Sequence, residues 1–234
     1  MTRTDVPLAT EDVDLIWQQC LFAFADPSVD VAFATAQRTW LDDTSWVDIV
    51  PGWLSGADLV FAELVARLPW RQREVTMWGK RVREPRLTHW WSTADGAEAL
   101  PVLAEARQAL TDRYSLPFDS IGCNLYRDGR DSVAWHADRE RYEREDPVVA
   151  VLSTGSPRPF HLRPKQVGEH QQRRSRVWWL GQGDLLVMGG ACQHDWEHCV
   201  PKVAIDAPRL SVVFRHHLSD GWLTEPGARY LADG

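Results

Sequence analysis

The chain has 234 residues, of which 44% are hydrophobic and 25% are charged, and its formal net charge is −7. This length allows a single domain with a sizeable core, and the composition is ordinary for a globular protein. The acidic total excludes a surface that is basic throughout, although a local basic face for nucleic acid remains possible.

The cysteines and the amino terminus bear on location. The four cysteines show no CxxC spacing, which favours reduced thiols in a cytosol over a disulfide framework. The first 20 residues carry acids where a signal peptide would have its apolar run, and no apolar stretch approaches about 18 residues. We therefore expect a cytoplasmic protein without a membrane span.

The chain begins with a segment to which the sequence assigns no role. Residues 9–24 and 30–40 are apolar enough to predict short helices. The stretch SWVDIVPGWLS, residues 45–55, predicts a strand followed by a turn. We expect residues 1–44 to be an N-terminal extension and residues 45–234 to form one domain.

Two longer helices and a basic, aromatic segment come next. Ser55 is expected to cap a helix over residues 55–68, with Asp58 completing a capping box. The segment between about 70 and 92 is basic, aromatic and strand-like in pieces. Residues 100–114 predict a second helix, because a proline stands in the first turn.

From residue 118 onward the pattern changes to short strands separated by turn signals such as RDGRD and GQGD. The expected strands lie at 120–127, 132–138, 148–153, 158–163, 176–181, 183–190 and 209–216. Many short strands with few helices predict a mainly β (α+β) fold, either a barrel-like sandwich or a jelly roll, with helices bracing one sheet.

One pair of residues within these strands suggests a metal site. His136 and Asp138 are two positions apart, so on a strand they point to the same face and could hold one cation. A third ligand would come from another strand, and either His194 or His198 would serve. Two imidazoles and one carboxylate suit Fe(II) in an oxygenase, although a zinc hydrolase could use the same ligand types.

Two arginines complete the pattern. Arg209 and Arg215 are six residues apart on one expected strand, so they share a face. Inward-facing arginines fit a small dicarboxylate, because the guanidinium fork matches a carboxylate; alternatively, they cap the edge of a sheet. Beside the metal pair, they imply 2-oxoglutarate as the cosubstrate.

The motifs NLYRDGRDSVAWHAD, GDLLVMGGACQHDWEHCVPK, RLSVVFRH and EPRLTHWW occur in this order over roughly residues 45–216. Together they resemble the AlkB family of Fe(II)/2-oxoglutarate dioxygenases, and most of all the nucleic-acid repair branch with its bacterial members. The resemblance implies a double-stranded β-helix (jelly roll) core at about 118–216, with bracing helices before it. It also implies a nucleotide-recognition lid at about 70–92.

The resemblance assigns roles to individual residues. The implied iron ligands, and thus the catalytic residues, are His136, Asp138 and His198. The implied 2-oxoglutarate residues are Asn124, Tyr126, Arg209, Ser211 and Arg215, where Ser211 replaces the usual asparagine of the family. The implied substrate-binding residues are Trp78, Lys80, Trp90, Arg139, Arg158 and Arg163.

The activity implied by the resemblance is oxidative dealkylation of N-alkylated bases in DNA or RNA. Fe(II), 2-oxoglutarate and O2 would yield succinate, CO2 and an aldehyde. The base would be flipped or already single-stranded, because a base inside a duplex cannot reach a buried iron. We expect a monomer that binds no membrane.

Two departures from the family concern substrate recognition. Residues 92–101 carry no aromatic residue to stack on the lesion, so Trp78 or Trp90 would take this role. Arg139 follows Asp138, where relatives often have an acid. The alternatives are therefore a hydroxylase of the same class acting on a protein, lipid or small molecule, and a non-catalytic binding module that kept the fold.

Overall fold

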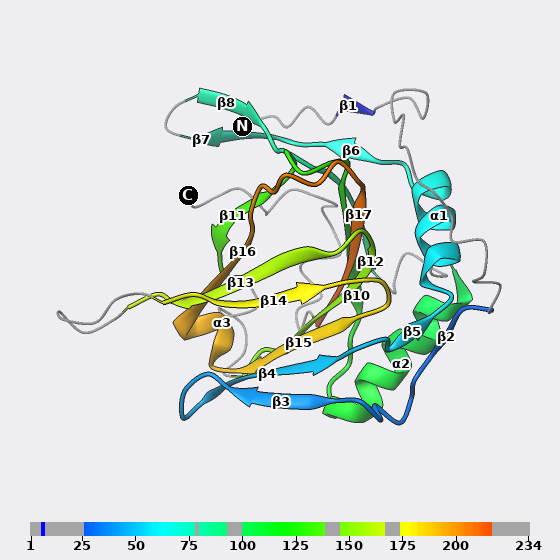
Figure 1. The fold of residues 1–234 in the computed structure, drawn as a ribbon, viewed down its shortest axis with the longest axis vertical. Coiled ribbons are helices and arrows are strands. Elements are labelled where there is room, and N and C mark those ends of the chain that lie inside the picture. The colour runs from blue at the N-terminus through cyan, green and yellow to red at the C-terminus, as the bar shows by residue number, and fades with distance from the viewer. Residues whose placement is uncertain are drawn as a thin grey trace.

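The computed structural model describes residues 6–7, 26–77, 80–92, 100–138, 146–166 and 174–216. The helix predicted over 9–24 lies outside these residues. Two antiparallel sheets dominate the fold, and two helices lie together on one side of the molecule (Figure 1). Among the described helices, none combines the length and the apolar character needed to cross a bilayer.

The larger sheet has nine strands and forms the centre of the molecule. In spatial order these strands are β1 (Val6–Pro7), β6 (Arg71–Gln72), β9 (Leu87–Ser92), β10 (Ser120–Tyr126), β17 (Arg209–Arg215), β12 (Val149–Gly155), β15 (Leu185–Gly190), β4 (Ser45–Val50) and β3 (Gln37–Trp40). All of its described pairings are antiparallel.

The smaller sheet faces one side of the larger one. Its four strands are, in spatial order, β11 (Val133–His136), β16 (Trp196–Val200), β13 (Arg158–Pro164) and β14 (Arg176–Leu180). Two further strand pairs join β2 (Ser28–Val29) to β5 (Leu54–Ser55) and β7 (Glu74–Met77) to β8 (Lys80–Arg83). The helices are α1 (Ala57–Arg67), α2 (Pro101–Tyr114) and the short α3 (Cys192–Asp195).

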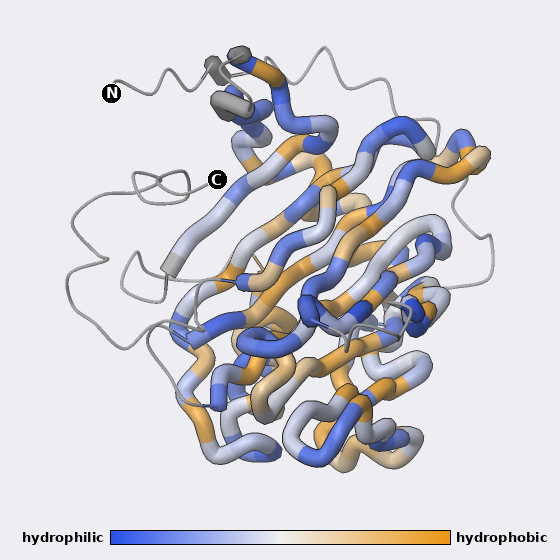
Figure 2. Tube along the Cα trace, turned by 90° about the vertical axis from the view of Figure 1, so that its left-hand side faces the viewer, coloured by the Kyte–Doolittle hydropathy of each residue, from blue (hydrophilic) through white to orange (hydrophobic). Residues whose placement is uncertain are grey.

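Both faces of the larger sheet are covered by other parts of the protein. Successive side chains along a strand point to opposite faces, so each strand contributes to two cores. On β12, Val149 and Val151 pack into the core between the two sheets, whereas Ala150 and Leu152 pack into the core under α1 and α2. A strand that is buried on both faces needs a continuous apolar run, as these residues provide. Figure 2 shows apolar segments running through the body of the strands, while many turns are hydrophilic.

The arrangement confirms the predicted jelly roll and the predicted bracing of one sheet by helices. The helix over 100–114 and the seven strands after residue 118 are confirmed with small shifts at their ends. The segment from 70 to 92 forms four short strands, of which β7 and β8 make a hairpin. The three described cysteines are free, in agreement with reduced thiols.

Three local predictions were wrong or incomplete. Residues 30–40 form a turn and strand β3 rather than a helix, because Gln37–Trp40 pairs with the edge of β4. Ser55 does not cap α1, since it pairs with Ser28 in a strand; Gly56 takes the N-cap position with φ 64°, a conformation that glycine adopts easily. Strand β16 was not predicted as a separate strand, although it carries His198.

Candidate metal centre and cavity

Three possible metal ligands meet at the end of the smaller sheet. His136 ends β11 and pairs directly with His198 on β16, while Asp138 follows β11 by two residues. One donor atom from each residue lies within 4.8 Å of the other two. The structure therefore brings together the predicted set and selects His198 over His194, which lies on α3.

The two imidazole rings of this group are in the protonation state that binds a cation. Nδ1 of His136 lies 2.9 Å from the carbonyl oxygen of Ala134, which places a proton on Nδ1 and leaves Nε2 free to bind a metal. Burial lowers the pKa of His198 to about 3, so its ring is neutral at physiological pH. Neutral imidazole is the form that binds metals.

Asp138 offers the charged ligand. Burial by itself raises the pKa of Asp138, but Arg215 and the two histidines outweigh this effect and hold the pKa well below its usual range. Its Oδ1 accepts a hydrogen bond of 2.9 Å from Arg215, whereas its Oδ2 is buried without a hydrogen-bond partner. A buried carboxylate oxygen without a partner, 3.9 Å from Nε2 of His198, fits a bound cation.

Two histidines and one carboxylate on one side of a cation leave its other positions open to the cavity. Sites with this ligand set hold Fe(II) in oxygenases, whose cosubstrates occupy the open positions. The choice between iron and zinc depends on what else the cavity binds, because the ligand types suit both.

The four predicted cosubstrate residues at the far end of the cavity lie on two paired strands. Asn124 on β10 pairs with Ser211 on β17, and Tyr126 pairs with Arg209. All four line a single cavity of about 660 Å³ that also contains the metal ligands. Asn124 Nδ2 lies 3.4 Å from Oγ of Ser211, so the two side chains meet across the strands.

Arg209 is the buried cation of this end, with 1% of its surface exposed. Its Nε donates to Oγ of Ser153 at 3.1 Å, and its guanidinium lies 5.2 Å from the centre of the Tyr126 ring. Burial lowers its pKa to about 10, which leaves it charged at neutral pH. A buried guanidinium that lines a cavity and has no described carboxylate partner fits the carboxylate of a small ligand.

Arg215 lies at the other end of the same face. Six residues separate it from Arg209, which corresponds to about 20 Å along a strand. Its Nη2 donates to Oδ1 of the metal ligand Asp138. The two arginines therefore serve different ends of the cavity, and a contact between Arg215 and the cosubstrate stays a prediction.

We call the buried part of the cavity the cavity floor. It includes the three metal ligands together with Asn124, Tyr126, Arg209 and Ser211. The outer part is the cavity rim, and its described residues are more exposed and belong to the lid segment, β11 and the chain after β16. The rim includes Arg73, Arg83, Glu84, Trp90, Trp135 and Lys202. It combines two aromatic rings with three cations.

The predicted substrate-binding residues have different outcomes. Trp90 lines the rim, as predicted, and is partly buried. Trp78 and Arg139 lie outside the described residues, and for Lys80 only the backbone in β8 is described. Arg163 is on β13, where its Nε donates to Glu197 at 2.6 Å and its guanidinium lies 4.0 Å from the Trp135 ring centre.

Arg158 requires a correction. It is 1% exposed and does not line the cavity, because its guanidinium donates to three backbone carbonyl oxygens inside the protein. A side chain in this position cannot reach a phosphate or a base. The two arginines of β13 were predicted alike, but residues 158 and 163 are five apart and so point to opposite faces of the sheet.

Two residues of the site were missed. Gln193 is buried, and its Oε1 accepts a hydrogen bond of 2.9 Å from the backbone N–H of Asp138. Arg86 lines the cavity and donates from Nε to Oδ1 of Asn124 at 3.1 Å, while it forms an ion pair with Glu84. Both occur inside the motifs quoted above, but their spacing gives no signal because their partners are far away in sequence.

Comparison with known families agrees with this geometry. A profile of the 2OG-Fe(II) oxygenase superfamily matches residues 47–217. The alpha-ketoglutarate-dependent dioxygenase alkB homolog 3 of Mus musculus is 33% identical over 228 residues, covering 85% of this chain and 80% of the mouse protein. The DNA oxidative demethylase ALKBH2 of Arabidopsis thaliana is 31% identical over 192 residues, covering 66% of this chain and 60% of the plant protein.

A solved structure shares the fold. The structure of OsALKBH1 superposes with a TM-score of 0.50 at 17% sequence identity, covering 77% of this chain and 100% of that chain. At this identity the superposition bears on the fold alone, and it agrees with the jelly roll described above. The sequence relationships carry the family assignment.

Proposed function

Because this chain belongs to the AlkB family of 2OG-Fe(II) oxygenases, we propose that it removes alkyl groups oxidatively from N-alkylated bases of nucleic acid. Its cofactors are those of the family: Fe(II), 2-oxoglutarate and O2. When bound, they would supply the oxidising chemistry: one oxygen atom of O2 would enter the N-alkyl carbon of the substrate and the other would enter succinate, with loss of CO2. The hydroxylated carbon then leaves as an aldehyde, which restores the base.

The residues of the chain bind and orient the reactants. His136, Asp138 and His198 would hold the iron, and Arg215 keeps Asp138 ionised. Arg209 would hold the distal carboxylate of 2-oxoglutarate with support from Tyr126. Because these groups are positioned before the ligands bind, the reactants meet in a fixed orientation.

One observation carries the proposal of a nucleic-acid substrate: the cavity that contains the metal ligands and Arg209 opens at a rim of aromatic and cationic residues. Aromatic rings stack on bases of any sequence, and cations bind the phosphates beside them. Trp90 is the described aromatic residue of the lid segment in this rim, and Arg73, Arg83 and Lys202 are its cations.

We propose that the segment from about 70 to 92 acts as a nucleotide-recognition lid over a base that is flipped or single-stranded. Its β7–β8 hairpin extends beyond the larger sheet (Figure 1), and Arg83 of β8 lines the cavity. A base that must reach a buried iron has to leave its stack, and a hairpin at the rim could hold it there.

The first experiment is a succinate-release assay with oligonucleotides that carry 1-methyladenine or 3-methylcytosine, in single and double strands. We expect the alkylated oligonucleotide to stimulate succinate release and to lose the mass of its methyl group. The His136→Ala variant is the blank, because it lacks one metal ligand.

Two results would change the proposal. Succinate release that is stimulated equally by unmodified oligonucleotides would contradict dealkylation. If 2-oxoglutarate binds but no alkylated oligonucleotide stimulates turnover, the iron site is intact and the substrate is a protein, a lipid or a small molecule.

We also propose that the chain acts as a monomer in the cytoplasm. One chain supplies the metal ligands, the cosubstrate residues and the rim of the cavity. Light scattering coupled to gel filtration tests the monomeric state, and a stable dimer with the activity of the enzyme would contradict it.

A further inference from the structure

Arg158 is a buried cation that the chemistry described above does not use. It lies on β13 with 1% of its surface exposed. Burial lowers its pKa, as expected for a charge removed from water. A buried charge is unfavourable unless its hydrogen bonds are satisfied, so an arginine in this position needs a structural or functional reason.

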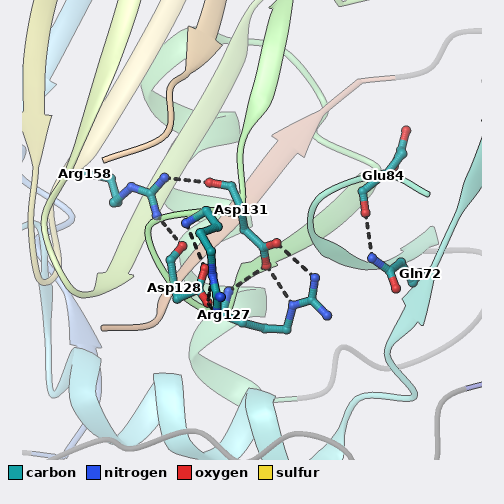
Figure 3. A network of polar contacts seen from close by, with 7 residues as sticks. Gln72, Glu84, Arg127, Asp128, Asp131 and Arg158 are labelled. Carbon is teal, nitrogen blue, oxygen red and sulfur yellow. Dashed lines mark hydrogen bonds and ion pairs between the residues drawn. The ribbon is translucent and has the colours of Figure 1, made fainter. Parts of the chain in front are cut away.

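Its hydrogen bonds indicate that reason, and Figure 3 shows those to Asp128 and Asp131. Nη1 donates to the carbonyl oxygen of Asp128 at 2.9 Å, and Nη2 donates to those of Asp131 and Pro201 at 2.8 Å each. The acceptors lie in two segments that are far apart in sequence. One guanidinium thus joins the loop over 127–131 to the chain after β16.

Each segment adjoins a strand that carries a metal ligand. The loop over 127–131 leads into β11, which ends at His136, and Pro201 directly follows β16, which carries His198. The pairing of β11 with β16 is irregular, with described partners only at Val133↔Val200 and His136↔His198. Because the ladder between these strands is incomplete, a bond between their ends has more influence on their separation.

The loop itself is closely fitted to the chain that it faces. The N–H of Val203 donates to the carbonyl oxygen of Gly129 at 2.8 Å, and a Cβ on Gly129 would lie 2.0 Å from the carbonyl oxygen of Val203. Asp131 accepts two hydrogen bonds from the guanidinium of Arg127. The loop is therefore a fixed element that can transmit its position to β11.

Arg158 also contacts the cosubstrate end of the cavity from behind. Its guanidinium lies 5.4 Å from the centre of the Tyr126 ring, and that of Arg209 lies 5.2 Å from the same centre. Tyr126 and Arg209 line the cavity, whereas Arg158 does not. An effect of Arg158 on 2-oxoglutarate therefore passes through Tyr126 or through its charge repulsion with Arg209.

We infer that Arg158 is a positioning residue, which holds the strands of His136 and His198 at the separation that the metal requires and supports Tyr126 at the cosubstrate end. A lysine would not reproduce this arrangement, because its three N–H donors leave a single nitrogen, whereas Arg158 reaches its acceptors from two separate nitrogens of a rigid plane. The inference concerns the iron and 2-oxoglutarate site alone, so it holds whether or not the substrate is a nucleic acid.

The test compares Arg158→Met and Arg158→Lys with Arg176→Met in the full chain. Arg176 is a matched control, because it also donates to two backbone carbonyl oxygens, of Trp40 and Leu41, from the same sheet. Mn(II) is titrated into metal-free protein without substrate, and 2-oxoglutarate is then titrated into the Mn(II)-loaded protein.

We expect Arg158→Met to weaken Mn(II) binding about 10-fold, as for loss of a partner that orients metal ligands. The same variant should weaken 2-oxoglutarate binding, and hydrogen exchange in metal-free protein should increase at 128–136 and 196–201. Arg176→Met should leave both affinities within about twofold, because the described contacts of Arg176, with Trp40, Leu41 and the Trp196 ring, include no metal ligand and no residue of the cavity lining.

Two outcomes would overturn the inference. If Arg158→Met binds Mn(II) and 2-oxoglutarate as the unchanged protein does, Arg158 is merely structural, whatever its melting temperature. If Arg158→Met does not fold, Arg158→Lys decides: binding and exchange equal to those of the unchanged protein would also reject a positioning role.

Discussion

The floor and the rim of one cavity are built in different ways. On the floor, Asp138 is 3% exposed, Arg209 is 1% exposed and Ser211 is 2% exposed. At the rim, Lys202 is exposed and Arg83, on β8 of the lid hairpin, is exposed as well. Apart from Asp138, which follows β11, the floor residues lie on the paired strands β10, β11, β16 and β17, whereas the rim comes from the lid segment, from Trp135 of β11 and from the chain after β16.

This difference separates two tasks. Groups on paired strands inside a core are held by many contacts, so the metal and the cosubstrate meet fixed partners. Groups on an exposed hairpin can change without disturbing that core. The floor should therefore determine which reaction occurs, and the rim should determine which substrate is accepted.

The largest expected effect is on the floor. Asp138→Asn removes the charged ligand and leaves Arg215 as a buried cation without its carboxylate. We expect Mn(II) or Fe(II) affinity to fall by more than about 100-fold, beyond the loss for an outer partner of the ligands. Calorimetric titration measures the metal affinity, and His194→Ala is the control. An equal loss of metal affinity in both variants would contradict the assignment of His198 as the third ligand.

The next effect concerns the cosubstrate. Arg209→Met removes the buried cation at the far end of the cavity, so we expect the KM for 2-oxoglutarate to rise about 100-fold, as for loss of a charged hydrogen-bonded pair. Metal affinity should change little, because Arg209 makes no described contact with the metal ligands. A KM that does not move would place the distal carboxylate elsewhere.

A third prediction follows from the buried imidazole. The pKa of His198 is lowered from 6.5 to about 3, so in this range the unfolded chain binds a proton that the folded chain does not. Stability present above pH 6.5 is therefore lost as the pH falls. Between pH 6.5 and 5 the metal-free protein should lose about 2 kcal/mol more unfolding free energy than His198→Asn.

Urea unfolding at several pH values measures this difference. The outcome also bears on the contrast between floor and rim. Folding shifts the pKa of a buried group, whereas the pKa of an exposed group stays near its value in the unfolded chain. Parallel stability profiles for the two proteins would show that His198 is not held neutral by the fold.

The smallest expected effect is at the rim. Trp90→Ala removes an aromatic ring from the cavity opening, so the KM for an alkylated oligonucleotide should rise about tenfold, the contribution of one stacked base. The KM for 2-oxoglutarate should stay the same. Trp40→Ala is the control, since Trp40 is 56% exposed and lies outside the cavity lining; a rise in both variants would argue against a specific stacking site.

The floor could be predicted from the sequence further than the rim. The two-residue spacing of His136 and Asp138 predicted that both lie at one point, and the structure brings their donor atoms together. The alternation of Asn124 with Tyr126 and of Arg209 with Ser211 likewise fits the two cross-strand pairs. For the rim, local composition indicated aromatic and basic residues, but only the assembled cavity shows which of them face it.

By itself, the sequence determined the chemical types of the floor residues and the strands that carry them except β16, because strand periodicity is a local property that fixes which face each residue occupies. The tertiary structure decided which histidine joins the pair, and it placed Arg209 and Arg215 at opposite ends of one face. It also buried Arg158 beneath two distant segments. These outcomes depend on contacts between residues far apart in the chain, and local spacing carries no information about such contacts.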